Sequence, residues 1–148
     1  TLAQFVDSKI EAITASPNAL LRFARAGLRH KFKHMRASSS PMTAATSKEI
    51  RAALGDNLWV GYGNSEAGGM LAVGLAADTA EKIPGCVGKP VVALKIVSGE
   101  VWVKTLGMSE GYADAALTAV RFVDGWFNTK DAGYLTDNGL LVLTGRRA

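Results

Sequence analysis

The feature that most constrains the fold is a change in the length of the apolar segments about halfway along the chain. Before residue 55, apolar residues recur at the spacing of amphipathic helices. After residue 90, the apolar runs shorten to the length of strands and cover residues 91–97, 100–105 and 140–144. Helices followed by mostly antiparallel strands are typical of an α+β (α/β) arrangement or of parts of two subdomains.

Three helices are expected in the first half. The first has apolar residues at helical spacing, namely Leu2, Phe5, Val6, Ile10 and Ile13. Ser16 and Pro17 are typical of a helix cap followed by proline at the first helical position, and they predict a second helix. The third covers residues 43–54 and ends at Gly55, after a loop over residues 38–41.

Turn residues place the later elements. A short apolar strand over residues 58–62 stops at Gly63 and is followed by the polar residues Asn64, Ser65 and Glu66. Asn138-Gly139 supplies positive φ angles for a tight hairpin between the two apolar segments that flank it. Residues 114–122 are expected to form one short helix.

Composition describes an ordinary globular chain of single-domain size, with 148 residues, 48% hydrophobic and 20% charged. Cys86 is the only cysteine, which excludes an internal disulfide and a cysteine zinc site and suits a cytoplasmic protein. The longest apolar tract, residues 67–77, has about half the length of a membrane helix. The start has no signal-peptide pattern and no initiator methionine, so an internal segment of a longer protein is expected.

The net charge of +4 raises the possibility of a nucleic-acid partner, but the cations are dispersed apart from one cluster over residues 22–36. Such a mixed basic and apolar stretch is more typical of a solvated helix face and its exit loop. His30 and His34, four residues apart in this stretch, could share a helix face and bind a metal. Surface histidines near a helix end are the favoured interpretation.

Common catalytic signatures are missing from the sequence, including GxxxxGK[ST], GxGxxG and HExxH. Glu66 follows the carboxyl end of a predicted strand, where open α/β sheets bind ligands. A helix cap or a solvated loop acid is the alternative for Glu66. Asp131 lies at the start of the predicted hairpin, where acids that favour turns are common.

Several motifs, taken in order, resemble the adenylate-forming superfamily of acyl- and aryl-CoA synthetases, luciferases and peptide-synthetase adenylation domains. The segment 62–66, Tyr-Gly-Asn-Ser-Glu, resembles its Y-G-x-T-E motif. The segment 125–135, followed by Gly145 and Arg146, resembles G-W-F-x-T-G-D-x-G-Y-L and G-R. Residues 84–90 and 99–103 resemble P-G-S-V-G-x-P and G-E-L-W-V. The resemblance extends from about Phe32 to Arg146.

The resemblance implies a nucleotide site and a role for each matching residue. Tyr62 would stack on adenine, Ser65 and nearby amides would hold the α-phosphate, and Glu66 would coordinate magnesium. Asp131 would accept the ribose hydroxyls, and Arg146 would lie near the ribose and phosphate. The loop resembling G-G-A-P-L, beside the adenine, contributes Ser39, Ser40 and Pro41, and the first motif adds Gly63 and Asn64. Gly68, Gly69 and Met70 would flank the acyl pocket, unless the two glycines only form a turn that enters a buried strand.

The implied fold is the C-terminal part of the large N-terminal domain of an acyl-CoA synthetase. Residues 1–78 would form a helical and α/β part, and residues 79–148 a mainly antiparallel, distorted β-barrel-like subdomain ending before the family's hinge. The implied reaction activates a carboxylic acid with ATP and magnesium to acyl-AMP and then forms a thioester with CoA. The partners are therefore the acid, ATP and CoA, with neither nucleic acid nor a membrane span.

Departures from the family pattern limit the activity expected of this chain. Lys130 replaces the glycine before the aspartate, and the segment between Val97 and Gly99 is short. The phosphate loop and the catalytic lysine of the family have no counterpart in the sequence, so the chain alone is expected to be inactive. A carrier-protein-loading adenylation domain and a truncated, non-catalytic nucleotide-binding or interaction module are the alternatives.

Overall fold

The computed structural model describes residues 4, 9–28 and 30–148. Contacts divide the chain into two units, one comprising Thr1–Gly61 with Gly74–Gly85 and the other Tyr62–Val73 with Cys86–Ala148. Two strands, β3 (Leu58–Asn64) and β4 (Gly69–Leu75), run from one unit into the other. The division of the sequence at residue 78 stays a prediction.

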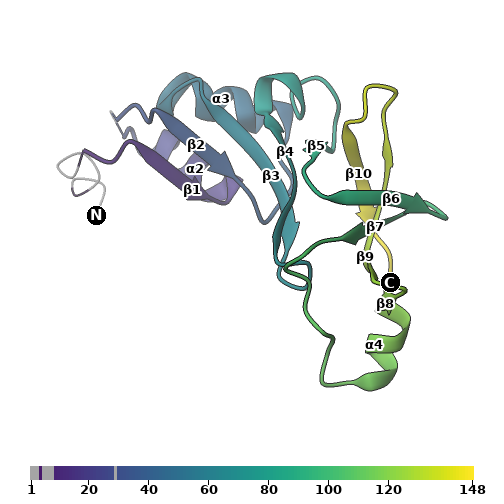
Figure 1. Ribbon diagram of the computed structural model, residues 1–148. Coiled ribbons are helices and arrows are strands. Elements are labelled where there is room, and N and C mark those ends of the chain that lie inside the picture. Colours follow the sequence, from purple (N-terminus) through teal and green to yellow (C-terminus); the bar gives the residue numbers. More distant parts are fainter. Residues whose placement is uncertain (1–3, 5–8, 29) are drawn as a thin grey trace. The chain divides into compact units, whose positions relative to one another are not determined.

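The first unit is built from parallel strands joined by helices (Figure 1). Its strands β1 (Ala12–Ala15), β2 (His34–Ala37) and β3 are neighbours, and both pairs are parallel. The helix α2 (Pro17–Arg25) connects β1 to β2, α3 (Ala44–Leu54) connects β2 to β3, and a short 3₁₀ helix, η1 (Ala76–Asp78), comes later. Parallel neighbours need such crossover connections.

The predicted starts of the second and third helices are confirmed. Ser16 Oγ accepts a hydrogen bond from the amide of Ala19 at 3.2 Å, and Pro17 takes the first helical position of α2. Thr43 Oγ1 accepts from the amide of Thr46 at 3.1 Å, and α3 ends at Gly55 as predicted. The core of the unit contains fully buried side chains from both helices and from two strands: Leu20, Met35, Ile50, Leu54 and Leu58.

The predicted first helix does not extend over its last two apolar positions. Leu2, Phe5 and Val6 lie outside the described residues and Gln4 is helical, but Ile10 lies in no helix and Ile13 belongs to strand β1. β1 pairs along its whole length with β2, and this non-local pairing outweighs the helical spacing of a few apolar residues. His30 also precedes β2 while His34 begins it, so the two histidines share no helix face and the metal hypothesis for them fails.

The second unit is an antiparallel assembly with one short helix (Figure 1). Its strands are the first part of β4, then β5 (Cys86–Pro90), β6 (Ala93–Val97), β7 (Glu100–Lys104), β8 (Phe122–Val123), β9 (Trp126–Leu135) and β10 (Leu141–Arg146). Their order is β4-β5-β10-β9-β7-β6, and β8 pairs with β9. The helix α4 (Ala115–Arg121), predicted over residues 114–122, is capped by Asp114.

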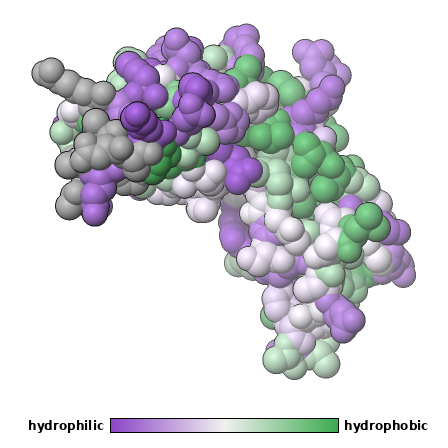
Figure 2. Space-filling view, turned by 60° about the vertical axis from the view of Figure 1, so that its left-hand side comes forward, coloured by the Kyte–Doolittle hydropathy of each residue, from purple (hydrophilic) through white to green (hydrophobic). Residues whose placement is uncertain are grey.

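The core of the second unit gathers side chains from five segments. It consists of Ala67, Leu71, Ala72, Val101, Val103, Phe127 and Leu141. Large apolar side chains also remain exposed in this unit, among them Leu106 and Val120. Figure 2 shows hydrophobic residues at the surface between hydrophilic ones.

Two hairpins shape the sheet of the second unit. β9 and β10 form the predicted hairpin, with Leu135 opposite Leu141, but only Gly139 of the Asn-Gly pair has a positive φ, at 77°. The expected turn with two positive φ angles is therefore wrong there, because the loop is longer than two residues. That geometry occurs instead between β6 and β7, where Ser98 and Gly99 have φ of 51° and 77°. The short segment after Val97 is thus a tight hairpin.

The fold class is mixed α/β, with parallel strands in the first unit and antiparallel strands in the second. The expectation of helices followed by strands holds only in part, because the first unit also contains strands. In the parts of the chain that the structure describes, no helix has both the length and the apolarity to cross a membrane.

Candidate functional site

The turn between β3 and β4 carries the polar residues of the first motif. Asn64 Oδ1 accepts a hydrogen bond from the amide of Ala67 at 2.9 Å, and the amide of Gly68 donates to the carbonyl of Ser65 at 3.1 Å. These bonds close the turn, with Ser65 exposed and Glu66 half-buried. Asparagine side chains that accept hydrogen bonds from nearby backbone amides commonly stabilise turns.

Glycine is required at two positions in and beside this turn, because the backbone of another segment lies too close for a Cβ atom. A Cβ at Gly63 would lie 2.1 Å from the carbonyl oxygen of Gly69, and one at Gly68 would lie 2.4 Å from that of Gly107. The space beside Gly68 is therefore filled by the chain itself rather than left for a substrate, whereas Gly69 has open space. The assignment of these glycines and of Met70, in β4, to an acyl pocket stays a prediction.

The loop from β7 to α4, residues 105–114, holds the turn in place. The Thr105 hydroxyl donates to the carbonyl of Ala67 at 2.6 Å, and the amide of Ser109 donates to the carbonyl of Glu66 at 2.8 Å. The Tyr112 hydroxyl donates to Glu66 Oε1 at 2.9 Å. The turn is thus fixed through both its backbone and its one acidic side chain.

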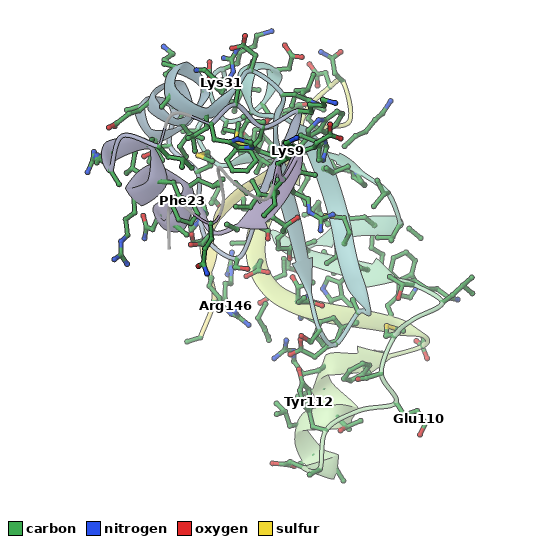
Figure 3. The ribbon with its side chains drawn as sticks, turned by 90° about the vertical axis from the view of Figure 1, so that its left-hand side faces the viewer. Lys9, Phe23, Lys31, Glu110, Tyr112 and Arg146 are labelled. Carbon is green, nitrogen blue, oxygen red and sulfur yellow. The ribbon has the colours of Figure 1, made fainter. Side chains whose placement is uncertain are left out.

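Tyr112 is a site residue that the sequence did not indicate. It is separated from Glu66 by 46 positions, and no motif or periodicity connects the two. Burial, followed by the hydrogen bond to Glu66, raises the pKa of Tyr112 above its ordinary value. The phenol therefore keeps its proton and acts as the donor. Figure 3 shows Tyr112 and Glu110 on the segment that leads into α4.

The metal role predicted for Glu66 rests on this one carboxylate. Among the described residues, no three His, Cys, Asp or Glu side chains form a cluster that could hold a metal. Magnesium at phosphate sites is bound by one or two carboxylates together with the phosphates of the substrate. A single half-buried carboxylate is compatible with that arrangement.

Tyr62 and Asp131, which are 69 positions apart, are in direct contact. The Tyr62 hydroxyl donates to Asp131 Oδ2 at 2.5 Å. Burial, followed by the hydrogen bond to Asp131, raises the pKa of Tyr62 far above its usual range. The Asp131 amide donates to Thr129 Oγ1 at 3.1 Å, and the buried Thr129 hydroxyl donates to the carbonyl of Val101 at 2.9 Å. Two hydrogen bonds, one to its side chain and one from its backbone amide, therefore hold Asp131 in place.

Arg146 completes this group from the neighbouring strand. It lies opposite Asp131 in the pairing of β10 with β9, and its Nε is 3.9 Å from Asp131 Oδ1. The Arg146 side chain is 70% exposed, so the ion pair is loose and most of the guanidinium faces solvent. Figure 3 labels Arg146 on its strand.

Lys130 adopts the left-handed conformation that usually favours glycine, with φ of 63°. Its amide donates to Asn128 Oδ1 at 2.8 Å, and its Nζ lies 3.3 Å from Glu100 Oε1. Asn128 Nδ2 also donates to Glu100 Oε2 at 2.7 Å. The hydrogen bond from Asn128, helped by Lys130 against the effect of burial, lowers the pKa of Glu100. These contacts hold the strained residue in position beside Asp131.

The third group of predicted residues lies in the first unit. Ser39, Ser40 and Pro41 form the loop between β2 and α3; all three are exposed, and Ser39 has φ of 74°. Tyr62, Asp131 and Arg146 form one cluster within the second unit, which also contains Gly63, Asn64, Ser65 and Glu66. The loop at residues 39–41 therefore belongs to a different unit from that cluster.

This arrangement can bind a nucleotide in chemical terms. A fixed carboxylate accepts hydroxyl groups such as those of ribose. A solvent-facing guanidinium suits a phosphate, and an aromatic ring suits a base.

Several curated proteins are similar to this chain in sequence. The chain is 35% identical over 130 residues to a long-chain-fatty-acid–CoA ligase of Mycobacterium bovis, covering 85% of this chain and 21% of that protein. It is 35% identical over 95 residues to the 2-succinylbenzoate–CoA ligase of Salmonella typhimurium, covering 62% of this chain and 20% of that protein. No protein-family model matches the chain.

Solved structures share the fold. An amide bond synthetase from Marinactinospora thermotolerans matches with a TM-score of 0.82 and 26% identity, covering 98% of this chain and 34% of that one. The O-succinylbenzoate coenzyme A synthetase of Bacillus subtilis, solved with ATP and magnesium, matches with a TM-score of 0.86 at 21% identity, covering 99% and 34%.

The curated relatives are carboxylate–CoA ligases. The chain belongs to the adenylate-forming family of these ligases. It spans about a fifth of the length of the curated relatives and about a third of the solved structures.

Proposed function

We propose that this chain is the part of an AMP-forming acyl- or aryl-CoA ligase that binds the nucleoside of ATP and one side of its phosphates. The observation that carries the proposal is the cluster of Tyr62, Asp131 and Arg146, in which the carboxylate is fixed and the guanidinium is exposed. A fixed carboxylate loses little conformational entropy on binding, which favours affinity. The ATP-bound relative of the same fold supports the choice of nucleotide.

Each residue of the site has a role in this proposal. Asp131 accepts the ribose hydroxyls, Arg146 binds near the ribose and phosphate, and the Tyr62 ring lies on the adenine. Ser65 and the backbone of Gly63 and Asn64 lie at the α-phosphate. The loop beside the adenine contributes Ser39, Ser40 and Pro41. The acyl pocket is flanked by Gly68, Gly69 and Met70.

Glu66 is the proposed ligand of magnesium. When bound, the ion neutralises charge on the phosphates of ATP. The exposure of Ser65 and the half-burial of Glu66, in a turn closed by its own hydrogen bonds, support a site at which a hydrated ion can arrive with its nucleotide.

The reaction proposed for the whole protein has two steps. A carboxylate oxygen of the acid attacks the α-phosphorus of ATP, and the bond from this phosphorus to the bridging oxygen breaks, giving acyl-AMP and pyrophosphate. The thiol of CoA then attacks the acyl carbon, loses its proton and displaces AMP to leave the thioester. The residues described here bind and orient the nucleotide in the first step.

The complete reaction is proposed for the whole protein, and this chain alone is expected not to catalyse it. The family's phosphate loop and catalytic lysine, which have no counterpart in this sequence, would stabilise the charge that moves in the first step. A barrel-like arrangement of the strands in the second unit is part of the same proposal.

Acid-dependent exchange of pyrophosphate into ATP tests the proposal. The assay uses this chain and any longer polypeptide that its gene encodes, across a panel of fatty, aryl and amino acids. Exchange is expected from the longer protein, and Asp131→Ala is expected to reduce it about 100-fold, because two hydrogen bonds to a charged group are lost. Asp137→Ala is the matched control, since Asp137 is exposed in the hairpin loop.

The outcomes separate the possible functions. Release of AMP that depends on CoA identifies the thiol acceptor, whereas transfer only to a carrier protein assigns the chain to an adenylation domain. A longer protein that is folded but exchanges pyrophosphate with none of the acids rules out the ligase assignment and leaves a binding module.

A further inference from the structure

Glu66 receives a hydrogen bond that the family motifs do not predict, from the Tyr112 hydroxyl to Oε1 at 2.9 Å. The other carboxylate oxygen, Oε2, has no hydrogen-bond partner among the described residues. A carboxylate held at one oxygen presents the other in a fixed direction. This is the geometry by which outer hydrogen bonds orient the ligands of metal sites.

The Tyr112 side chain is itself held by several contacts. Its amide donates to Thr118 Oγ1 at 2.8 Å, and its ring makes an edge contact with Phe122, with centroids 5.7 Å apart. The guanidinium carbon of Arg121 lies 5.9 Å from the centre of the same ring. The first turn of α4 and the strand after it thus fix the hydroxyl that reaches Glu66.

The local backbone is adapted to this arrangement. Gly111 has φ of 147°, and a Cβ there would lie 2.5 Å from Thr118 Cγ2. The turn that carries Glu66 is tied to the same loop through the carbonyls of Glu66 and Ala67. The acid and the tyrosine are therefore kept together by contacts that do not depend on their own hydrogen bond.

We propose that Tyr112 is a positioning residue, whose hydroxyl holds Glu66 Oε1 so that Oε2 faces the magnesium ion that accompanies ATP. This inference rests on the proposed function, because it takes Glu66 as the magnesium ligand. Tyr112 itself contacts neither the ion nor the nucleotide.

The test is direct binding of Mn²⁺, as a paramagnetic substitute for Mg²⁺, to this chain in the presence and absence of ATP. Free Mn²⁺ is measured by electron paramagnetic resonance and compared with the same mixture of Mn²⁺ and ATP without protein, because ATP alone also binds Mn²⁺. Tyr112→Phe, which removes only the hydroxyl, is expected to weaken the ATP-dependent Mn²⁺ binding about 10-fold. Tyr134→Phe is the matched control, since Tyr134 is 47% exposed on β9, and it is expected to bind as the unsubstituted chain does.

Two further variants make the test decisive. Glu66→Gln is expected to abolish the ATP-dependent binding, and Thr118→Ala, which loosens Tyr112 but keeps its hydroxyl, to weaken it less than Tyr112→Phe does. Thermal unfolding and circular dichroism verify the fold of each variant. Thr118→Ala replaces Tyr112→Phe as the test if the latter does not fold.

The failure of the inference and the failure of the proposed function give different results. If Glu66→Gln abolishes binding while Tyr112→Phe and Thr118→Ala bind like the unsubstituted chain, Tyr112 has no positioning role. If Glu66→Gln binds Mn²⁺ unchanged, or the folded chain binds none with ATP, the magnesium role of Glu66 is overturned as well. Tighter binding by Tyr112→Phe would also overturn the inference, because the hydroxyl would then compete with the ion.

Discussion

At the scale of single residues, the site depends on a backbone conformation that its sequence disfavours. Lys130 has a positive φ immediately before Asp131, and its Nζ reaches Glu100. A side chain in this conformation costs about 1 kcal/mol relative to glycine. The family's glycine at this position therefore has a physical reason, and the replacement by lysine is partly offset by an ion pair.

A comparison of two variants separates the backbone effect from the ion pair. Lys130→Ala and Lys130→Gly both lose the contact with Glu100, but only glycine removes the strain. Lys130→Gly is expected to be more stable than Lys130→Ala by about 1 kcal/mol in urea unfolding, against the usual preference of ordered chains for alanine. Equal stability, or a more stable alanine variant, would show that the conformation is not strained.

At the scale of elements, α3 is tied to the segment after η1 by one acidic side chain. Ser47 Oγ donates to Glu81 Oε1 at 2.7 Å, and Arg51 Nη1 lies 2.9 Å from the same oxygen. The side chains of Arg51 and Glu81 are 25% and 10% exposed. Burial opposes the ionisation of Glu81, but the hydrogen bonds from Ser47 and Arg51 outweigh it, and the pKa of Glu81 lies below its usual value.

The stability that this carboxylate provides depends on pH in a direction that follows from its pKa. Because the folded-state pKa is lowered, the contribution is present above the unfolded value of 4.5 and is lost as the pH falls through the lower folded-state value. Glu81→Gln is therefore expected to lower the free energy of unfolding by about 2 kcal/mol at pH 7, between the values typical of exposed and buried pairs. The difference should shrink as the pH is lowered from 5 to 3, measured by urea unfolding at each pH.

A second partner of the same arginine supplies the control. Asp56 lies 3.6 Å from Arg51 but its side chain is 91% exposed, so Asp56→Asn is expected to change the stability by less than about 0.5 kcal/mol. A Glu81→Gln effect that stays constant with pH would mean that packing, rather than charge, holds α3 to this segment.

Elements with local signals were predicted well from the sequence, and elements formed by distant pairing were not. The capped helices starting after Ser16, Thr43 and Asp114 and the hairpin at Gly139 carry their signals within a few residues. The four-residue strands β1 and β2 carry none, because their parallel pairing joins segments about 20 residues apart. The ten-residue strand β9 was obscured by its turn-like residues.

The same reasoning separates the predicted from the unpredicted parts of the site. The motifs predicted Tyr62, Glu66, Asp131 and Arg146 as site residues, because a known family has similar residues in the same order. Nothing in the sequence indicates the hydrogen bonds of Tyr62 with Asp131 and of Tyr112 with Glu66, since each joins positions far apart. The roles of the named residues toward ATP stay predictions that the experiments above address.

At the scale of the whole molecule, the proposed nucleotide residues are distributed over both units. The cluster around Asp131 belongs to the second unit, and the loop with Ser39, Ser40 and Pro41 to the first. A nucleotide slows amide hydrogen exchange only where it stabilises the folded chain against local opening. Exchange measured with and without ATP and Mg²⁺ can therefore report on each unit separately.

Slower exchange is expected in the second unit at residues 62–68, 131–132 and 145–146. At a concentration of ATP about ten times the dissociation constant, the stabilisation is about 1.4 kcal/mol, which corresponds to roughly tenfold slower exchange. Amides of α2, remote in sequence from every proposed contact, serve as the internal reference, and Asp131→Ala should remove the effect. Protection that extends to residues 38–41 would show that the first unit also responds to the nucleotide. Protection absent from residues 62–68 and 131–132 would contradict the nucleotide site, because the cluster of Tyr62, Asp131 and Arg146 is the part of the proposal that this chain carries by itself.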